Sequence, residues 1–202
     1  PFQGFSVEFS EHRKYVAGDD LKDLDWSVYA KTDKYYLKKF QAETNVTGYL
    51  VMDLSASMAY TYRQELTKFE YGICLAAALG YLMIHQQDAV GLVTFDTESR
   101  RYIPARSRVT HLRAILQELS KTQPGGETSL APIFHDVAER IHRRGLVVII
   151  SDLFDDPDDL LKALHHFRYR KHEVLLLHLM AEEELTFPFD AWSNFEDLEV
   201  AD

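Results

Sequence analysis

The chain has 202 residues, of which 46% are hydrophobic and 12% aromatic, and its 22 basic and 32 acidic residues give a formal net charge of −10. This length and apolar content suit one large domain with a buried core and exclude an intrinsically disordered chain. The acidic balance argues against nucleic acid as a partner, because a broad nucleic-acid-binding surface would need the opposite sign.

The sequence contains one cysteine, Cys74, and no long apolar segment. A single cysteine excludes an intrachain disulfide and a Cys-based zinc site, and it fits a reducing compartment. No apolar run reaches the ~18 residues that a membrane-spanning helix needs, so we expect a cytoplasmic location and no membrane contact from this stretch. The chain opens at Pro1 without a signal-peptide pattern, and we interpret it as a piece of a longer protein.

Residues 1–34 are polar and rich in turn-forming residues, and they predict an irregular arm. From residue 35 onward, short apolar runs alternate with longer segments of helical periodicity. Strands are expected at residues 35–42, 48–53, 89–95, 101–103, 146–150 and 173–180, and helices at 65–86, 109–119, 130–141 and 157–167. Because several strands are continuously apolar, they should be buried on both faces. The predicted fold class is therefore α/β, a doubly wound, mostly parallel sheet flanked by helices.

Oxygen-bearing side chains follow two of the predicted strands. Three of them alternate directly after the strand at 48–53, so that an extended segment would point them in one direction. A threonine precedes the helix at 130–141, and an aspartate follows the strand at 146–150. Ligands of parallel sheets bind outside the carboxyl ends of the strands, and carboxylate and hydroxyl oxygens suit Mg²⁺ or Mn²⁺. The sequence therefore predicts one metal site, made of Asp53, Ser55, Ser57, Thr128 and Asp152.

The same residues have a plainer interpretation. An Asp-x-Ser-x-Ser segment can cap a following helix without any metal. Two ionised carboxylates about 6 Å apart repel by about 3 kcal/mol at an effective dielectric near 20. Asp155 and Asp156, which should lie close by, would add further negative charge. Such a cluster needs a cation, a proton or dispersal into solvent, so a metal-free structural scaffold stays an alternative.

Two resemblances follow from these residues. The set Asp53-x-Ser55-x-Ser57, Thr128 and Asp152 resembles the metal-ion-dependent adhesion site of von Willebrand factor A-type domains. Nearly the whole chain resembles the bacterial family called domain of unknown function 58. The motifs that carry this second resemblance are Arg13-x-Tyr15-x-x-Gly18-Asp19, Asp25-Trp26, Ala30-Lys31, Lys39-Phe40-x-x-Glu43, Ser57-Met58, Gly91-Leu92-x-x-Phe95, Pro104, His111-Leu112, Ser151-Asp152-Leu153 and Arg170-Lys171-His172-Glu173-Val174.

The resemblances imply an organisation and a function. Residues 1–43 would be the N-terminal arm and edge strand of the family, and residues 44–202 a von Willebrand factor A-like domain. Members of the family are commonly encoded beside MoxR-type AAA+ ATPases, with which they are thought to act in assembling or maturing protein complexes. We therefore expect a metal-dependent protein-interaction module rather than an enzyme, with no catalytic residue. A protein partner would offer an acidic side chain to the metal.

Enzymatic alternatives are weaker. A metal-dependent phosphohydrolase of the haloacid-dehalogenase type also begins with an aspartate after a strand, but it usually carries a second acid two residues later as general acid. Here that position is Ser55. The chain also lacks the Gly-x-Ser-x-Gly motif of many serine hydrolases and the phosphate-binding loop of P-loop ATPases.

The histidines and two basic stretches are expected to be ordinary surface features. His165 and His166 are adjacent on a predicted helix and therefore point about 100° apart, so they should not share a metal. His135 and His142 lie near one helix face without an obvious acidic partner. The basic stretches at residues 140–144 and 168–171 fit solvated helix ends, although a positive patch for an acidic partner is the alternative.

Overall fold

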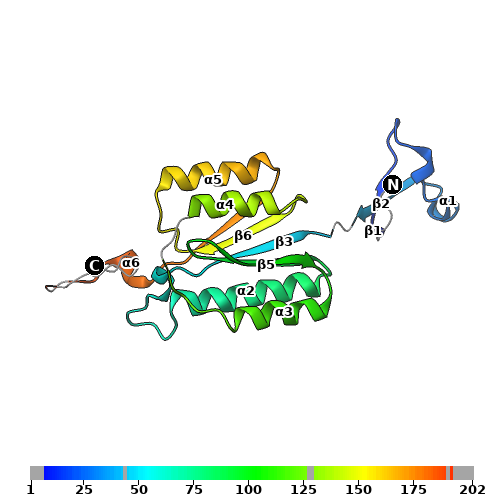
Figure 1. Ribbon diagram of the computed structural model, residues 1–202. Helices are drawn as coiled ribbons and strands as arrows, with labels where there is room; N and C mark the ends of the chain where they lie inside the picture. Colours follow the sequence, from blue (N-terminus) through cyan, green and yellow to red (C-terminus); the bar gives the residue numbers. More distant parts are fainter. Residues whose placement is uncertain (1–6, 43–44, 127–129, 190–191, 193–202) are drawn as a thin grey trace. The chain divides into compact units, whose positions relative to one another are not determined.

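The structure is a computed structural model that describes residues 7–42, 45–126, 130–189 and 192 (Figure 1). The chain divides into two units, residues 1–45 and residues 46–202. The five predicted site residues all belong to the second unit.

The first unit is built on a β-hairpin. Strand β1 (Val7–Lys14) pairs antiparallel with β2 (Tyr36–Ala42), with a register shift between Phe9 and Glu11. A 3-10 turn (Leu21–Asp23) and helix α1 (Trp26–Thr32) lie in the connection. The segment is thus more regular than its turn-rich sequence suggested, and β2 belongs to this two-stranded sheet rather than to the main sheet.

One aspartate organises the connection of this hairpin. The carboxylate of Asp25 accepts hydrogen bonds from the backbone N–H groups of Ser27 and Val28 and so caps α1. Its other oxygen lies 2.9 Å from the His12 ring nitrogen Nε2 and 3.5 Å from the Lys38 ammonium. The pKa of Asp25 is lowered, chiefly by the hydrogen bond with His12. The side chain therefore ties α1 to both strands of the hairpin.

The second unit is a five-stranded sheet in the order β5-β4-β3-β6-β7. Four strands are parallel, namely β3 (Thr47–Asp53), β4 (Ala89–Phe95), β6 (Leu146–Ser151) and β7 (Glu173–His178), and β5 (Ser99–Arg106) runs antiparallel at one edge. Helices α2 (Lys68–His85) and α3 (Val109–Leu119) cover one face, and α4 (Leu130–Arg140) and α5 (Pro157–Tyr169) cover the other (Figure 1). Two short pieces complete the unit, a 3-10 turn (Ala56–Ala59) and helix α6 (Glu182–Thr186). The predicted α/β class is confirmed.

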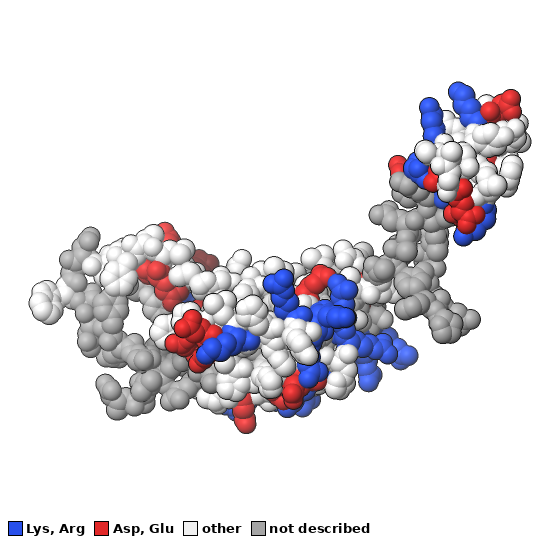
Figure 2. Space-filling model, turned by 90° about the horizontal axis from the view of Figure 1, so that it is seen from above, with Lys and Arg blue, Asp and Glu red and all other residues white. Residues whose placement is uncertain are grey.

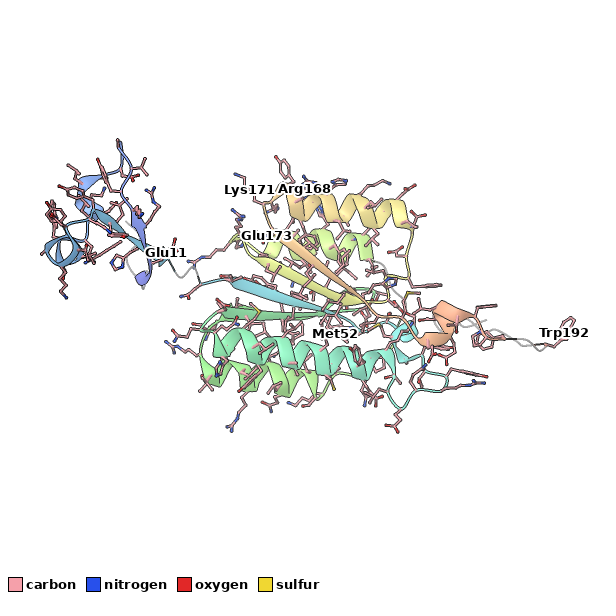
Figure 3. All side chains as sticks on the ribbon, turned by 180° about the vertical axis from the view of Figure 1, so that it is seen from behind. Glu11, Met52, Arg168, Lys171, Glu173 and Trp192 are labelled. Atoms are coloured by element: carbon pink, nitrogen blue, oxygen red, sulfur yellow. The ribbon has the colours of Figure 1, made fainter. Side chains whose placement is uncertain are left out.

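The central strand β3 shows why the sheet is covered twice. Successive side chains of a strand point to opposite faces. Val51 belongs to the core cluster formed with α4 and α5, whereas Leu50 and Met52 belong to the cluster formed with α2 and α3. Met52 lies between the sheet and α2 (Figure 3). The continuous apolar run of this strand therefore reflects burial on both faces.

Helix α2 begins where the sequence carries a capping signal. Thr67 accepts a hydrogen bond from the Glu70 backbone, and the Glu70 carboxylate accepts one from the Thr67 backbone, which completes a capping box. The box places Lys68 at the first helical position.

None of the helices in the described part of the chain is long and apolar enough to cross a membrane.

Candidate metal centre

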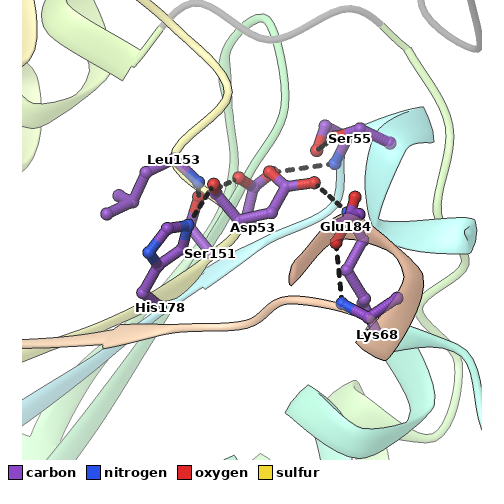
Figure 4. Close-up of polar contacts among 10 residues, drawn as sticks. Asp53, Ser55, Lys68, Ser151, Leu153, His178 and Glu184 are labelled. Atoms are coloured by element: carbon purple, nitrogen blue, oxygen red, sulfur yellow. Dashed lines mark hydrogen bonds and ion pairs between the residues drawn. The ribbon is translucent and has the colours of Figure 1, made fainter. Parts of the chain in front are cut away.

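The pairing of β3 with β6 brings Asp53, the first predicted ligand, next to Ser151 at the carboxyl end of the sheet. Asp53 ends β3 and is completely buried, at 0% exposure. Its Oδ1 accepts a hydrogen bond from the Ser55 backbone N–H at 2.8 Å, and its Oδ2 accepts one from the Ser151 hydroxyl at 2.5 Å (Figure 4). Ser151 closes β6 and in turn accepts a bond from the Leu153 N–H. The Asp53 carboxylate is therefore fixed in orientation by the loop that follows it and by the end of β6.

The two serines of the predicted motif also converge. The hydroxyl oxygens of Ser55 and Ser57 lie 3.0 Å apart, with Ser55 fully buried and Ser57 partly exposed. The loop that holds them is braced by the turn at Gly125 and Gly126. The Ala56 N–H donates to the Gly126 carbonyl at 2.9 Å, and the Gly125 N–H donates to the Leu54 carbonyl at 2.7 Å.

Thr128, the fourth predicted ligand, lies outside the described residues. The nearest described residues in sequence are Gly126 and Leu130. Gly126 packs beside the Asp53 loop with φ of +95°, a conformation that favours glycine. Leu130 begins α4, and its backbone N–H donates to the Asp155 carboxylate at 2.7 Å.

Asp152, the fifth predicted ligand, is held by a residue that the sequence analysis did not single out. Its Oδ2 lies 2.8 Å from the ammonium nitrogen of Lys68, and the two side chains are 5% and 6% exposed. Its Oδ1 is buried and has no hydrogen-bond partner among the described residues. A buried carboxylate oxygen without a partner is unfavourable, so this atom is one that a cation would satisfy.

Lys68 connects the site to helix α6. Its ammonium also lies 2.8 Å from Glu184 Oε1, while Glu184 Oε2 accepts a bond from the Ala181 backbone (Figure 4). Burial lowers the pKa of Lys68, but hydrogen bonds to Asp152 and Glu184 outweigh it and leave the pKa raised. Lys68 is therefore a permanent positive charge beside the predicted metal ligands.

Burial dominates the electrostatics of Asp53. Desolvation raises its pKa to about 6, against hydrogen bonds from Ser151 and Ser55 that lower it, and the nearby charge of Asp152 raises it further. The site thus holds a carboxylate that binds a proton far more readily than an exposed aspartate does. A divalent cation at this position would remove that preference for the proton.

Three other described acids at the carboxyl end of the sheet already have partners. Asp155 accepts from the Leu130 N–H, and Asp156 accepts from two N–H groups at the start of α5. Asp96, after β4, is paired with Arg100 at 2.6 Å. Burial raises the pKa of Asp96, but the hydrogen bond from Arg100 and the backbone bonds outweigh it and leave the pKa lowered. These three acids act as caps or ion-pair partners in the structure.

A pocket of about 780 Å³ opens beside Lys68. It lies between the segment that leads into α2 and the segment between β7 and α6. Its lining combines exposed apolar side chains with polar ones, among them Tyr60, Gln64, Leu66, Tyr71 and Met180. Lys68 lines this pocket and contacts Asp152, so a concave surface lies close to the predicted metal ligand.

The sequence matches the family described as protein of unknown function DUF58 over residues 11–202. The chain belongs to this family. Uncharacterized proteins of Mycobacterium tuberculosis and Mycobacterium bovis are each 28% identical over 189 residues, which covers 92% of this chain and 58% of the relatives. The chain thus spans 58% of the length of these curated relatives.

Solved structures show the same fold at low sequence identity. A conserved hypothetical protein BatB from Bacteroides thetaiotaomicron matches with a TM-score of 0.55 at 15% identity, over 65% of each chain. An aerotolerance-related membrane protein from Bacteroides fragilis matches with a TM-score of 0.52 at 18% identity, over 65% of this chain and 66% of that one. The resemblance to the DUF58 family and the von Willebrand factor A-like fold predicted from the sequence are confirmed.

Proposed function

We propose that this chain is a metal-dependent protein-interaction module. Mg²⁺ or Mn²⁺ would be held by Asp53, Ser55, Ser57, Thr128 and Asp152. The observation that carries the proposal is the buried Oδ1 atom of Asp152, which has no hydrogen-bond partner among the residues described. It belongs to the same strand-end site as the buried Asp53 carboxylate and the two converging serine hydroxyls.

The contacts of these residues suit different roles. The 3.0 Å between the Ser55 and Ser57 hydroxyl oxygens is close to the edge of an octahedron with Mg²⁺–oxygen bonds of about 2.05 Å, which is about 2.9 Å. Both oxygens of Asp53 already accept hydrogen bonds, which fits a role through bound water. Asp152 keeps Oδ1 free for direct ligation while Lys68 holds its Oδ2.

The bound ion would supply a coordination position for a carboxylate of a protein partner. The pocket beside Lys68 offers the rest of such a partner an apolar and polar surface. The family resemblance makes a MoxR-type AAA+ ATPase the partner that we propose, with this chain as its accessory or adaptor in complex assembly or maturation. The cytoplasmic location that this partnership implies stays a prediction.

Lys68 favours a second candidate, a metal-free structural scaffold. Its ammonium already neutralises Asp152 at 2.8 Å and is itself locked in place by Glu184. In this alternative the strand-end carboxylates serve only to tie α2, β6 and α6 together. A phosphohydrolase has no comparable support, because Ser55 stands where the general acid would be.

Thermal unfolding in EDTA and in excess Mg²⁺ or Mn²⁺ separates the two candidates. Metal at 100 times its dissociation constant stabilises a protein by about 2.7 kcal/mol, which for this size corresponds to a rise in Tm of roughly 5–10 °C. We expect this rise in the wild type and not in Asp152→Asn or Ser57→Ala. Asp158→Asn, an exposed acid at the start of α5, is the matched control and should keep the rise. An unchanged Tm at millimolar metal in the wild type would support the scaffold instead.

A further inference from the structure

A second group of metal-ligating side chains lies on helices α4 and α5, apart from the strand-end site. His135 and Glu139 are one turn apart on α4, and His166 is in the last turn of α5. One ligand atom from each of the three residues lies within 4.8 Å of the other two. The two imidazole rings face one another, with centroids 4.2 Å apart and planes inclined by 37°. Packing of the two helices therefore assembles the group.

His166 carries a ring nitrogen that is available to a metal ion. The Nε2 atom of His166 is buried and has no hydrogen-bond partner in the described part of the chain. Burial lowers the pKa of His166, and the neighbouring His135 and Arg170 lower it further. Metal ions bind the neutral form of imidazole. A buried ring nitrogen without a hydrogen-bond partner in the described residues, beside a second imidazole, is therefore available to a cation.

Helix ends and nearby charges act on this position in opposite directions. Glu139 and His166 both lie in the last turn of their helices, where the exposed carbonyl groups favour positive charge. Against this, Arg170 Nη2 lies 3.8 Å from Glu139 Oε1 and competes for the carboxylate. Lys and Arg side chains also gather on this part of the surface (Figure 2), including Arg168 and Lys171 at the end of α5 (Figure 3). Arg170 is therefore expected to weaken cation binding.

We propose that His135, Glu139 and His166 form a site for Zn²⁺, with a fourth coordination position open to water. Two imidazole nitrogens and a carboxylate are a donor set that zinc accepts. The 3.5 Å between His135 Nε2 and Glu139 Oε1 is close to the edge of a tetrahedron with bonds of about 2.05 Å, which is about 3.3 Å. The other distances among the three ligand atoms are within 4.8 Å, so metal binding requires small side-chain rotations. The side chains of His135 and Glu139, which are 58% and 55% exposed, permit these rotations.

This site is independent of the metal centre proposed above. Leu130, the first residue of α4, is bonded to Asp155 beside the strand-end site, and Glu139 lies nine residues further on. That separation is about 13 Å along the helix axis. The strand-end site is made of oxygen donors and suits hard cations, whereas the helix site has two nitrogens and suits borderline ones. Each of the two proposed metal sites can therefore be tested without reference to the other.

The test is titration of the whole chain, without an affinity tag, with Zn²⁺ by calorimetry and with Co²⁺ by visible absorption. Excess Mg²⁺ is present throughout to occupy the strand-end site. We expect one Zn²⁺ bound in the micromolar range or tighter, and a tetrahedral Co²⁺ spectrum. His135→Ala should weaken binding at least tenfold, and its exposed position makes it safe for folding. His166→Ala should abolish the spectrum, and Arg170→Ala should tighten binding.

His165→Ala is the matched control, since His165 is the exposed neighbour of His166 on the same helix. This variant should bind Zn²⁺ as the wild type does, and so should Asp152→Asn. Absence of Zn²⁺ binding in the wild type would overturn the proposal. So would binding that survives both His135→Ala and His166→Ala, or binding that His165→Ala weakens as much as His135→Ala.

Discussion

Lys68 and Asp152 form a buried ion pair, with 2.8 Å between the ammonium nitrogen and Oδ2, that joins the first turn of α2 to the end of β6. The pair leaves the second oxygen of Asp152 without a hydrogen-bond partner in the described residues. Glu184 from α6 completes the contacts of the ammonium at 2.8 Å. Lys68 therefore controls both the stability of the site without metal and the charge that an incoming metal meets.

Lys68→Met should destabilise the metal-free protein. Removing one partner of a buried ion pair leaves the other charge uncompensated, which costs about 3–5 kcal/mol. We expect the free energy of unfolding in EDTA, measured by urea denaturation, to fall by about 3 kcal/mol. Lys162→Met is the control, because Lys162 forms an exposed pair with Asp159 on α5, and its loss should change stability by less than about 1 kcal/mol. Equal effects of the two substitutions would contradict the structural role of Lys68.

The same substitution should tighten metal binding. Without the ammonium, Asp152 and Glu184 present more negative charge to a cation, and the electrostatic attraction rises. We expect the dissociation constant for Mn²⁺, measured by calorimetry, to fall at least tenfold in Lys68→Met, which corresponds to about 1.4 kcal/mol. Addition of Mn²⁺ should then recover part of the stability lost in EDTA. Unchanged or weaker Mn²⁺ binding would show that Lys68 does not oppose the metal.

The sheet of the second unit was predictable because its signals are local. Continuous apolar runs identified the parallel strands, and the predicted helix at 109–119 matches α3 (Val109–Leu119). Parallel neighbours bring their carboxyl ends together, which is why Asp53 and Asp152 were expected in one site. In the structure Asp53 is hydrogen-bonded to Ser151, the residue before Asp152. The helix predicted at 65–86 likewise matches α2, which begins three residues later, after the capping box at Thr67. These features depend on residues close in sequence or on the general rules of parallel sheets.

The contacts that the sequence did not reveal are long-range ones. A lysine at the start of a helix is normally solvated, and Lys68 is buried because α6 brings Glu184 over it from 116 residues away. Helix α6 itself has three consecutive glutamates, Glu182 to Glu184, and too few residues for an apolar stripe. His135 was expected to lack an acidic partner, which is wrong, because Glu139 lies four residues later on the same helix at 3.5 Å. The long-range member of this cluster is His166 on α5. Only the packing of the two helices specifies that grouping.

Asp53→Asn should change how the stability of the metal-free protein depends on pH. Burial raises the pKa of Asp53 from 3.8 to about 6, so between these values the folded protein binds more protons at this group than the unfolded one. Its contribution to stability is therefore present below pH 3.8 and is lost as the pH rises through about 6. Above that pH, the loss amounts to about 3 kcal/mol, at 1.36 kcal/mol per pKa unit. The asparagine variant lacks this loss.

The measurement for Asp53 is urea denaturation in EDTA between pH 4.5 and 7.5. The wild type should lose stability relative to Asp53→Asn as the pH rises, and the difference should level off above pH 6.5. Asp158→Asn provides the reference for an exposed acid. A wild-type curve parallel to that of Asp53→Asn would show that the buried carboxylate does not titrate in this range.

His172 should give the opposite pH dependence. The residue is buried beside the Phe167 ring, and burial lowers its pKa from 6.5, with the charge of Arg170 acting in the same direction and backbone groups of Ile141 and Gly145 opposing it. The unfolded chain therefore binds more protons at this group once the pH falls below 6.5, and stability is lost as the pH falls further, down to the folded pKa. His172→Leu, which cannot ionise, should lose less stability than the wild type between pH 7 and pH 5. Urea denaturation of both proteins at these two pH values measures the difference, with His165→Leu as the exposed control on α5. If His172→Leu and the wild type lose equal stability on acidification, His172 ionises as easily in the folded protein as in the unfolded chain.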